Sequence, residues 1–269
     1  MKQILFLTFC LVVSIPLWAQ PDSIQSQLPV KISHAEPLYV DLIRDLGARK
    51  GEREWNVGYG MEGHPDYAAS HAFVEFEFSP VNRLGLEVEV PFSFYTSTSH
   101  STEQVIPRSR MEGIKLASQY TFLVSPKNQL SMAAGYMHEF RMHSFYSIER
   151  GRGMLKGNSL SPFLIIAKKF GNRVNTMIYT GPEWEITPEE KKNELFYQLN
   201  ISAHYVLAAG HFVGVEVNDE LGAAGKQLVV RPQVKLKFNK RFALGLVTGI
   251  PVSFKEHGMS FMTRIIFEP

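Results

Sequence analysis

The chain has 269 residues, a formal net charge of +2 and 45% hydrophobic residues. A charge this close to zero gives no reason to expect nucleic acid as a partner. The only cysteine, Cys10, lies near the N-terminus, which excludes an internal disulfide and a metal site built from several cysteines.

The first nineteen residues have the layout of a secretory signal peptide. Lys2 provides a positive start, and an apolar run from Ile4 to Trp18 ends next to Ala19. We therefore predict a signal peptide over residues 1–19, cleaved near Ala19. After it, no apolar stretch approaches the 18 residues of a membrane-spanning helix, which excludes a helical membrane protein.

Residues 20–54 form a separate region before the first predicted strand. Residues 21–33 are rich in Gln, Ser and Pro and are predicted to be an exposed tail. Leu38, Leu42, Ile43 and Leu46 then follow at helical spacing, and Gly47 provides a stop signal. The spacing predicts a short amphipathic helix.

From about Trp55 the apolar residues recur with a period of two. In the stretch Leu84–Tyr95 the even-numbered residues from Leu84 to Phe94 are apolar, while Glu87 and Glu89 fall on the opposite face. Such alternation indicates a strand with one apolar and one polar face. Its length fits the roughly 9–11 residues with which a tilted strand crosses a bilayer.

Twelve segments share this pattern, and the links between them alternate in length. The segments cover 55–62, 71–78, 84–95, 114–122, 129–141, 160–170, 173–182, 195–205, 212–218, 228–238, 242–252 and 259–267. The tight links are 79–83, 125–128, 171–172, 209–210 and 239–240; the longer ones are 63–66, 96–110, 142–158, 183–193, 219–225 and 253–258. Short periplasmic turns and longer external loops are typical of outer-membrane barrels.

The sequence thus predicts an all-β protein: an antiparallel, up-and-down transmembrane β-barrel of about twelve strands over residues 55–269. Residues 20–54 become a periplasmic tail and a short periplasmic helix that covers the barrel rim. A gating plug inside the lumen is the alternative for this helix. The predicted location is the outer membrane of a Gram-negative bacterium.

The segment HAEPLYVDLIRDLGARKGE, residues 34–52, resembles the opening of a family of small outer-membrane barrels of Bacteroidetes-type bacteria. The resemblance continues into Trp55–Gly58 and through Leu84–Phe94. It implies location and fold only, and no functional residue is carried over from it.

On the barrel interpretation the polar faces line the lumen. Four carboxylates from two adjacent strands share one wall, with Lys115 on the neighbouring strand as their natural partner, and three cations follow one later strand. The predicted pore-lining residues are Glu75, Glu77, Glu87, Glu89, Lys115, Arg231, Lys235 and Lys237. Opposed acidic and basic walls orient polar solutes in an aqueous pore. We expect a largely salt-bridged interior with a narrow path for small polar solutes, passive or gated.

Two other function classes remain open. A closed structural or adhesion barrel would act through its external loops, above all 96–110 and 142–158. The basic residues Arg141, Arg150, Arg152 and Lys156 of the second loop could contact lipopolysaccharide phosphates. A lipid hydrolase would need Ser, His and an orienting group on one face, a pattern that Asn200, Ser202 and His204 meet.

The sequence predicts no catalytic residue, no cofactor and no metal site, because none of its nine histidines lies in a metal-binding motif. The expected partners are outer-membrane lipid, lipopolysaccharide and a small polar solute.

Overall fold

The computed structural model describes residues 28–40, 42–64, 67–97, 106–189, 191–223, 225–252 and 258–269. The predicted signal peptide, the tail up to residue 27, most of loop 96–110 and residues 253–257 lie outside the described residues.

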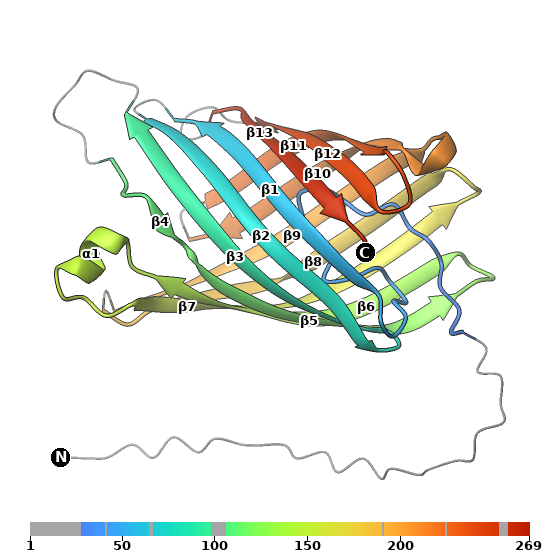
Figure 1. The fold of residues 1–269 in the computed structure, drawn as a ribbon, viewed down its shortest axis with the longest axis horizontal. Helices are drawn as coiled ribbons and strands as arrows, with labels where there is room; N and C mark the ends of the chain where they lie inside the picture. The colour runs from blue at the N-terminus through green and yellow to red at the C-terminus, as the bar shows by residue number, and fades with distance from the viewer. Residues whose placement is uncertain are drawn as a thin grey trace, which may run out of the picture.

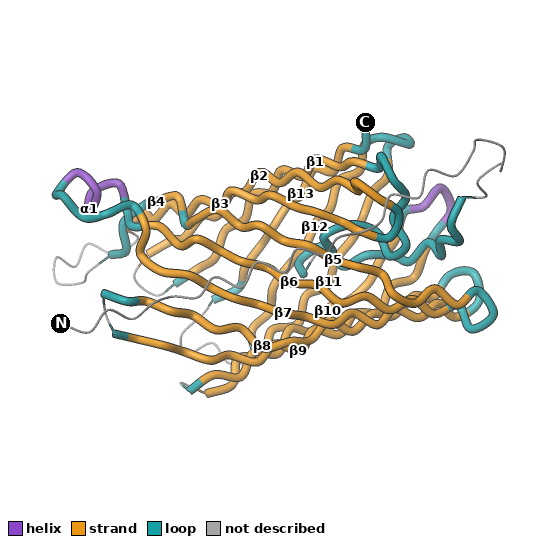
Figure 2. Tube along the Cα trace, turned by 90° about the horizontal axis from the view of Figure 1, so that it is seen from below, coloured by secondary structure: helices purple, strands orange, loops and turns teal. Residues whose placement is uncertain are grey.

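Twelve antiparallel strands form a closed barrel, as predicted (Figures 1 and 2). Each strand pairs with its neighbours in the chain, and the first strand pairs with the last, which closes the ring. A two-residue strand, β4 (Arg110–Met111), adds to the edge of β3. The twelve barrel strands are β1 (Arg53–Gly63), β2 (Tyr67–Val81), β3 (Leu84–Ser97), β5 (Gly113–Ser125), β6 (Leu130–Met142), β7 (Leu155–Phe170), β8 (Val174–Thr187), β9 (Lys192–Val206), β10 (Phe212–Gly222), β11 (Gly225–Lys237), β12 (Phe242–Pro251) and β13 (Ser260–Phe267).

The period-two pattern separates the two faces of each strand, as β1 illustrates. Trp55, Val57 and Tyr59 are exposed on the outside, whereas Glu54 and Asn56, which alternate with them, are buried in the lumen. Successive side chains of a strand point to opposite faces. An apolar outer face therefore follows directly from the sequence, and the polar residues of the same strands face inward.

The turns differ in length between the two ends of the barrel. We call the end with the links 82–83, 126–129, 171–173, 207–211 and 238–241 the short-turn end. The other end, the long-link end, carries the link 143–154 with the helix α1 (Phe145–Glu149), and β3 ends there at Ser97. A short 3₁₀ turn, η1 (Ala208–Gly210), lies in a link of the short-turn end.

Two links at the long-link end are shorter than predicted. The expected links 183–193 and 219–225 are mostly strand, because β8 continues to Thr187 and β10 to Gly222. Polar residues such as Glu185 and Glu194 still lie opposite each other in the backbone ladder of β8 and β9. Backbone N–H and C=O groups pair in a sheet whatever the side chains are. A strand end with polar side chains therefore lacks the apolar alternation that marks a strand, and its sequence predicts a loop.

The expected helix in residues 34–54 is not formed: the described residues 28–40 and 42–52 contain no helix. They run inside the barrel, along the trace drawn in blue in Figure 1, and do not cover the rim. Backbone N–H groups of Leu38, Val40, Ile43 and Gly47 donate to side chains of the barrel wall. These bonds replace the carbonyl partners that a helix would supply. No helix in the described part of the chain is long and apolar enough to span a membrane.

Candidate functional site

We call the described residues of the segment 28–52 the plug. Leu38, Leu42, Ile43, Leu46 and Ala48 are buried in the lumen, whereas Leu28 and Val30 at the start of the plug are exposed. The plug enters at the short-turn end, where His34 Nε2 lies 2.9 Å from Ser131 Oγ near the start of β6. It leaves at the same end, where Lys50 N donates to Asn82 Oδ1 in the β2–β3 turn at 2.9 Å. The deepest part, residues 37–40, is the plug tip.

The plug tip is held by acceptors on β10 and β11. Leu38 N donates to Gln233 Oε1 at 2.6 Å, and Val40 N donates to Glu216 Oε1 at 3.1 Å. Tyr39 N reaches the second oxygen of Glu216 at 3.4 Å. The guanidinium of Arg231 lies over the aromatic ring of Tyr39, with its central carbon 3.5 Å from the centre of that ring.

Apolar residues of the plug pack against an apolar patch of the lumen wall. Leu42, Ile43 and Leu46 are almost fully buried there. The patch consists of Ala117, Ala133, Phe163, Ile165, Ala167, Met177 and Tyr179 from β5 to β8. Removing such surface from water is favourable, so the helical spacing noted in the sequence correctly marked a buried face although no helix forms.

Arg44 joins the plug to the acidic wall. Its Nη1 lies 3.0 Å from Glu54 Oε2 and 3.4 Å from Glu77 Oε2, and the side chain is 3% exposed. Burial alone would lower the pKa of Arg44, but Asp45, Glu54 and Glu77 outweigh it and raise that pKa above its usual range. The guanidinium is therefore a permanent buried cation, neutralised by carboxylates of the wall.

The network continues across the seam between the first and last strands. Asn56 Nδ2 donates to Glu54, Glu75 and Glu77 at 3.0, 2.8 and 2.8 Å. Arg264 Nη2 on β13 lies 2.8 Å from Glu75 Oε1. Two guanidinium groups and one amide thus hold together a wall of carboxylates that would otherwise repel each other.

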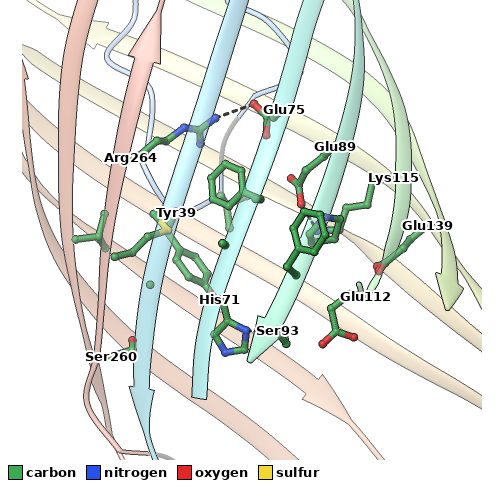
Figure 3. Close-up of a pocket in the computed structure, with 18 of the residues that line it drawn as sticks. Tyr39, His71, Glu75, Glu89, Ser93, Glu112, Lys115, Glu139, Ser260 and Arg264 are labelled. Carbon is green, nitrogen blue, oxygen red and sulfur yellow. Dashed lines mark hydrogen bonds and ion pairs between the residues drawn. The ribbon is translucent and has the colours of Figure 1, made fainter. Parts of the chain in front are cut away.

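A cavity of about 490 Å³ extends from the plug tip toward the long-link end (Figure 3). Tyr39, Val40 and Ile43 of the plug form one side of it. Seven glutamates and three Lys or Arg residues line it, an excess of four negative charges when all are ionised. They are Glu62, Glu75, Glu87, Glu89, Glu112, Glu139, Glu183, Lys115, Arg231 and Arg264.

The structure brings six of the eight predicted pore-lining residues into this region. Glu75, Glu87, Glu89, Lys115 and Arg231 line the cavity, and Glu77 is buried beside the plug. Lys115 Nζ lies 3.0 Å from Glu89 Oε1, which confirms its expected pairing with the acidic wall. Lys235 and Lys237 lie on the same inward-facing register of β11 but nearer the short-turn end, and they do not line the cavity.

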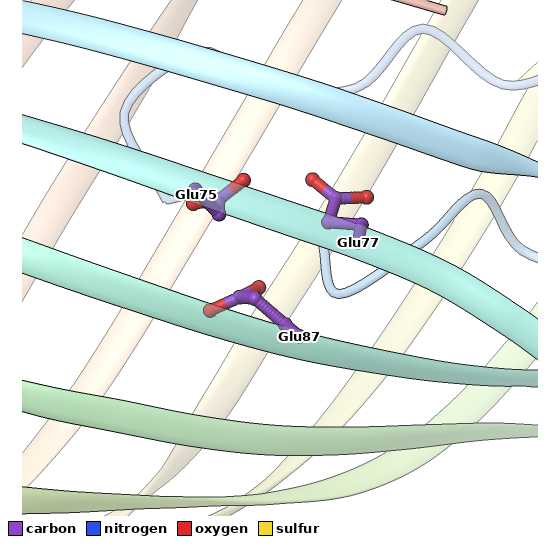
Figure 4. Close-up of side chains that lie close together, drawn as sticks. All are labelled: Glu75, Glu77 and Glu87. Carbon is purple, nitrogen blue, oxygen red and sulfur yellow. The ribbon is translucent and has the colours of Figure 1, made fainter. Parts of the chain in front are cut away.

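Glu75, Glu77 and Glu87 come close together, with one oxygen from each within 4.8 Å of the others (Figure 4). Carboxylate oxygens are ligands for hard cations. Arg264 and Arg44 already pair with Glu75 and Glu77, however. The cluster is therefore an ion-paired part of the wall, and we assign no metal to it.

Asn200, Ser202 and His204 share the inward face of β9, as expected, but do not form a catalytic triad. Ser202 Oγ has no hydrogen-bond partner among the described residues, so His204 does not act on it as a base. A nucleophilic serine needs a base within hydrogen-bond reach. The geometry gives no support to the hydrolase alternative.

Several lumen residues were missed at the sequence level. Glu139 shares one face of β6 with Met137 and Arg141 and could have been found from that two-residue period. Glu183 was placed in a link that is in fact strand. Glu216 alternates with Val215 and Val217, which predicts its inward direction. Its role as an acceptor and the role of Arg44 carry no such signal, because both arise only from the insertion of the plug.

Several solved barrels are similar to the chain in fold. A crystal structure of an outer-membrane channel from Pseudomonas putida F1 has a TM-score of 0.66 at 10% sequence identity, covering 84% of this chain and 98% of that one. The NanC porin has a TM-score of 0.57 at 7% identity, covering 80% and 99%. The KdgM porin has a TM-score of 0.53 at 12% identity, covering 79% and 98%. At such identities the likeness concerns the fold alone.

No curated protein matches the chain in sequence. A family does: residues 30–268 match the HAEPLYID-like proteins. The match includes the segment 34–52 on which the resemblance to a barrel family rested, whereas a Bacteroidetes-type origin stays a prediction. Since the match spans nearly all of the described residues, the chain belongs to the HAEPLYID-like family.

Proposed function

We propose that this protein is a gated pore for small polar solutes in the outer membrane of a Gram-negative bacterium, closed here by its plug. One observation carries the proposal: the lumen holds a cavity of about 490 Å³ lined by ionisable side chains that ends on the plug tip. A barrel with a purely structural role does not need an open cavity, and in smaller barrels side chains fill the interior. The alternation of outward-facing apolar and inward-facing polar residues along the strands supports the membrane location.

The charge of the cavity sets the expected selectivity. Seven carboxylates against three cationic side chains give it a negative potential. Rings of Asp and Glu favour cations in channels, so anions are expected to be disfavoured and neutral solutes admitted. We propose Glu75, Glu77, Glu87, Glu89, Lys115, Arg231, Lys235 and Lys237 as pore-lining residues, together with Glu139 and Glu183.

Single-channel recording of the refolded protein in planar bilayers tests the pore. We expect discrete conductance steps and, in a salt gradient, a reversal potential that indicates cation preference. Glu139→Gln removes one lining carboxylate and is expected to lower that preference. Glu149→Gln, an exposed glutamate of α1 that does not line the cavity, is the matched control. A folded barrel that never conducts, even after its plug has been loosened, would rule out a pore.

A contact with lipopolysaccharide is favoured by one feature of the long-link end. The guanidinium carbons of Arg108 and Arg150 lie 3.8 and 4.2 Å from the ring centre of Tyr146 in α1. Guanidinium groups held in this way are suited to phosphate. We propose that this cluster binds lipopolysaccharide phosphates. Arg108→Gln with Arg150→Gln is expected to weaken binding to lipopolysaccharide vesicles, and unchanged binding would dismiss the contact.

A further inference from the structure

The plug tip rests on a polar patch of the lumen wall that we call the polar seat. It consists of Asn200 and Ser202 on β9, Glu216 on β10 and Gln233 on β11. All four side chains are at least nine-tenths buried, between 0% and 5% exposed. The seat accepts three backbone N–H groups of the tip, as described above.

The tip satisfies only part of the seat. The donor Nδ2 of Asn200 and the hydroxyl of Ser202 are buried without a hydrogen-bond partner in the described part of the chain. Both residues face Pro37 and Val40 across a gap that is too tight to admit a water molecule. Buried polar groups are normally paired, so the seat presents hydrogen-bonding capacity that the tip does not use.

The charge of the only carboxylate in the seat, Glu216, is offset by a cation next to the seat, Arg231. Arg231 donates to Asn218 Oδ1, and Asn218 Nδ2 donates in turn to Glu216 Oε1 at 2.6 Å and to Asn200 Oδ1 at 2.6 Å. One guanidinium therefore balances one carboxylate through an amide. Carboxylate and amide oxygens accept hydrogen bonds here, while Asn200 and Ser202 can donate them. Groups that both donate and accept, such as hydroxyls, match this pattern.

We infer that the polar seat is a binding site for a small uncharged polyhydroxylated solute, and that the plug tip occupies it in the closed state. This inference rests on the proposed pore. The solute replaces the three N–H donors of the tip with hydroxyl donors and also pairs Asn200 and Ser202. Tip and solute therefore compete for one surface, and solute binding displaces the tip.

The rest of the plug stays in place during this exchange. Leu42, Ile43 and Leu46 cover an apolar patch whose exposure to water would be unfavourable. Arg44 is paired with Glu54 and Glu77. The movement is accordingly confined to the tip, whose own apolar anchor is Leu38 against Phe212, Ala243, Val247 and Ile266.

A disulfide can report whether the tip is seated. A Cβ placed on Gly245 of β12 would lie 2.8 Å from Leu38 Cδ2 and 3.4 Å from its Cγ, so Leu38→Cys with Gly245→Cys brings two thiols within disulfide reach. Cys10→Ser removes the remaining cysteine. The rate of disulfide formation under limiting oxidant then reports the fraction of time for which the tip is seated.

Sorbitol is the probe, and glycine betaine at equal osmolality is its control without hydroxyls. We expect sorbitol to slow disulfide formation about fivefold or more, because sorbitol and the seated tip exclude each other and such coupling typically changes an affinity at least about fivefold. We expect betaine not to slow it. Ser202→Ala is expected to abolish the sorbitol effect. Ser79→Ala, another buried serine whose hydroxyl has no partner in the described residues but which lies on β2, is expected to preserve it.

Equilibrium dialysis of radiolabelled sorbitol against the wild-type protein and Ser202→Ala repeats the test without cysteines. We expect binding by the wild type and its loss in the variant. A reduced double-cysteine protein that conducts but ignores sorbitol, with no binding in dialysis, overturns the inference and leaves the pore standing. A protein that binds sorbitol through Ser202 and conducts in neither redox state supports the seat and refutes the pore.

Discussion

At the scale of single residues, Arg44 connects the plug to the barrel. It is a buried cation whose carboxylate partners Glu54 and Glu77 are themselves buried. Alternation along β2 places Glu77 on the inward face. No local pattern pairs it with a residue 33 positions earlier, because that contact depends on the plug entering the lumen.

Replacing Arg44 with alanine leaves the buried carboxylate of Glu54 without its cation and leaves Glu77 with only the more distant Arg264, at 3.9 Å. Breaking a buried ion pair in this way costs about 3–5 kcal/mol, so we expect the free energy of unfolding to fall by about that amount. Urea titration of the protein in lipid vesicles measures it. Lys50→Ala, at an exposed position of the same plug, should change it by less than about 0.5 kcal/mol. Equal effects of the two substitutions would contradict the role given to Arg44.

At the scale of elements, the plug shows what a periodic pattern does and does not determine. Leu38, Leu42, Ile43 and Leu46 were expected on one face of a helix, and all four are buried. The backbone is not helical because wall side chains such as Gln119 and Thr121 take its N–H groups. Spacing predicts burial; hydrogen-bond partners from elsewhere in the chain decide the backbone conformation.

The plug should loosen in acid through His34. Burial and the positive charge of Lys169 lower the pKa of His34 to about 4, although the negative charge of Asp45 acts in the opposite direction. A released plug would titrate near the ordinary 6.5. The inserted state then binds fewer protons between these values, and its stability rises with pH across the window. The stability that neutral His34 adds to the inserted plug is complete above about pH 6.5 and is lost as the pH falls toward 4.

Conductance measured from pH 7 to pH 4 tests this, and we expect openings to become more frequent below about pH 6.5. The carboxyl of Asp45 does not titrate in this window. Burial would raise its pKa, but Glu36, Lys31 and Arg44 hold it well below the usual range. His34→Gln keeps a hydrogen-bonding group beside Ser131 without a titrating ring and should flatten the profile. An identical profile in the variant would assign the pH response to another group.

At the scale of the whole molecule, the barrel depends on the seam between β13 and β1. The strands pair from Trp55 with Phe267 to Glu62 with Ser260. Arg264, 2% exposed, spans the seam from the inside by pairing with Glu75 of β2 at 2.8 Å and with Asn56 of β1 at 3.2 Å.

Arg264→Leu removes the guanidinium from this seam and leaves Glu75 and Asn56 without it. We expect the heated barrel to lose its folded electrophoretic mobility at a lower temperature than the wild type. Arg173→Ala, in the exposed β7–β8 turn, provides the comparison and should leave the midpoint unchanged. Equal midpoints for all three proteins would show that the backbone ladder closes the barrel without help from the charge network.

The sequence by itself determined the twelve strands, which residues face outward and which inward, and the acidic wall formed by Glu75, Glu77, Glu87 and Glu89. These features follow from a two-residue period that is local to each strand. Only the tertiary structure decided the place of the plug, the extent of β8 and β10, and the partners of Arg44, Glu216 and Arg264. Those depend on the register of barrel closure and on a segment that threads the lumen, so they bring together residues that no local period relates.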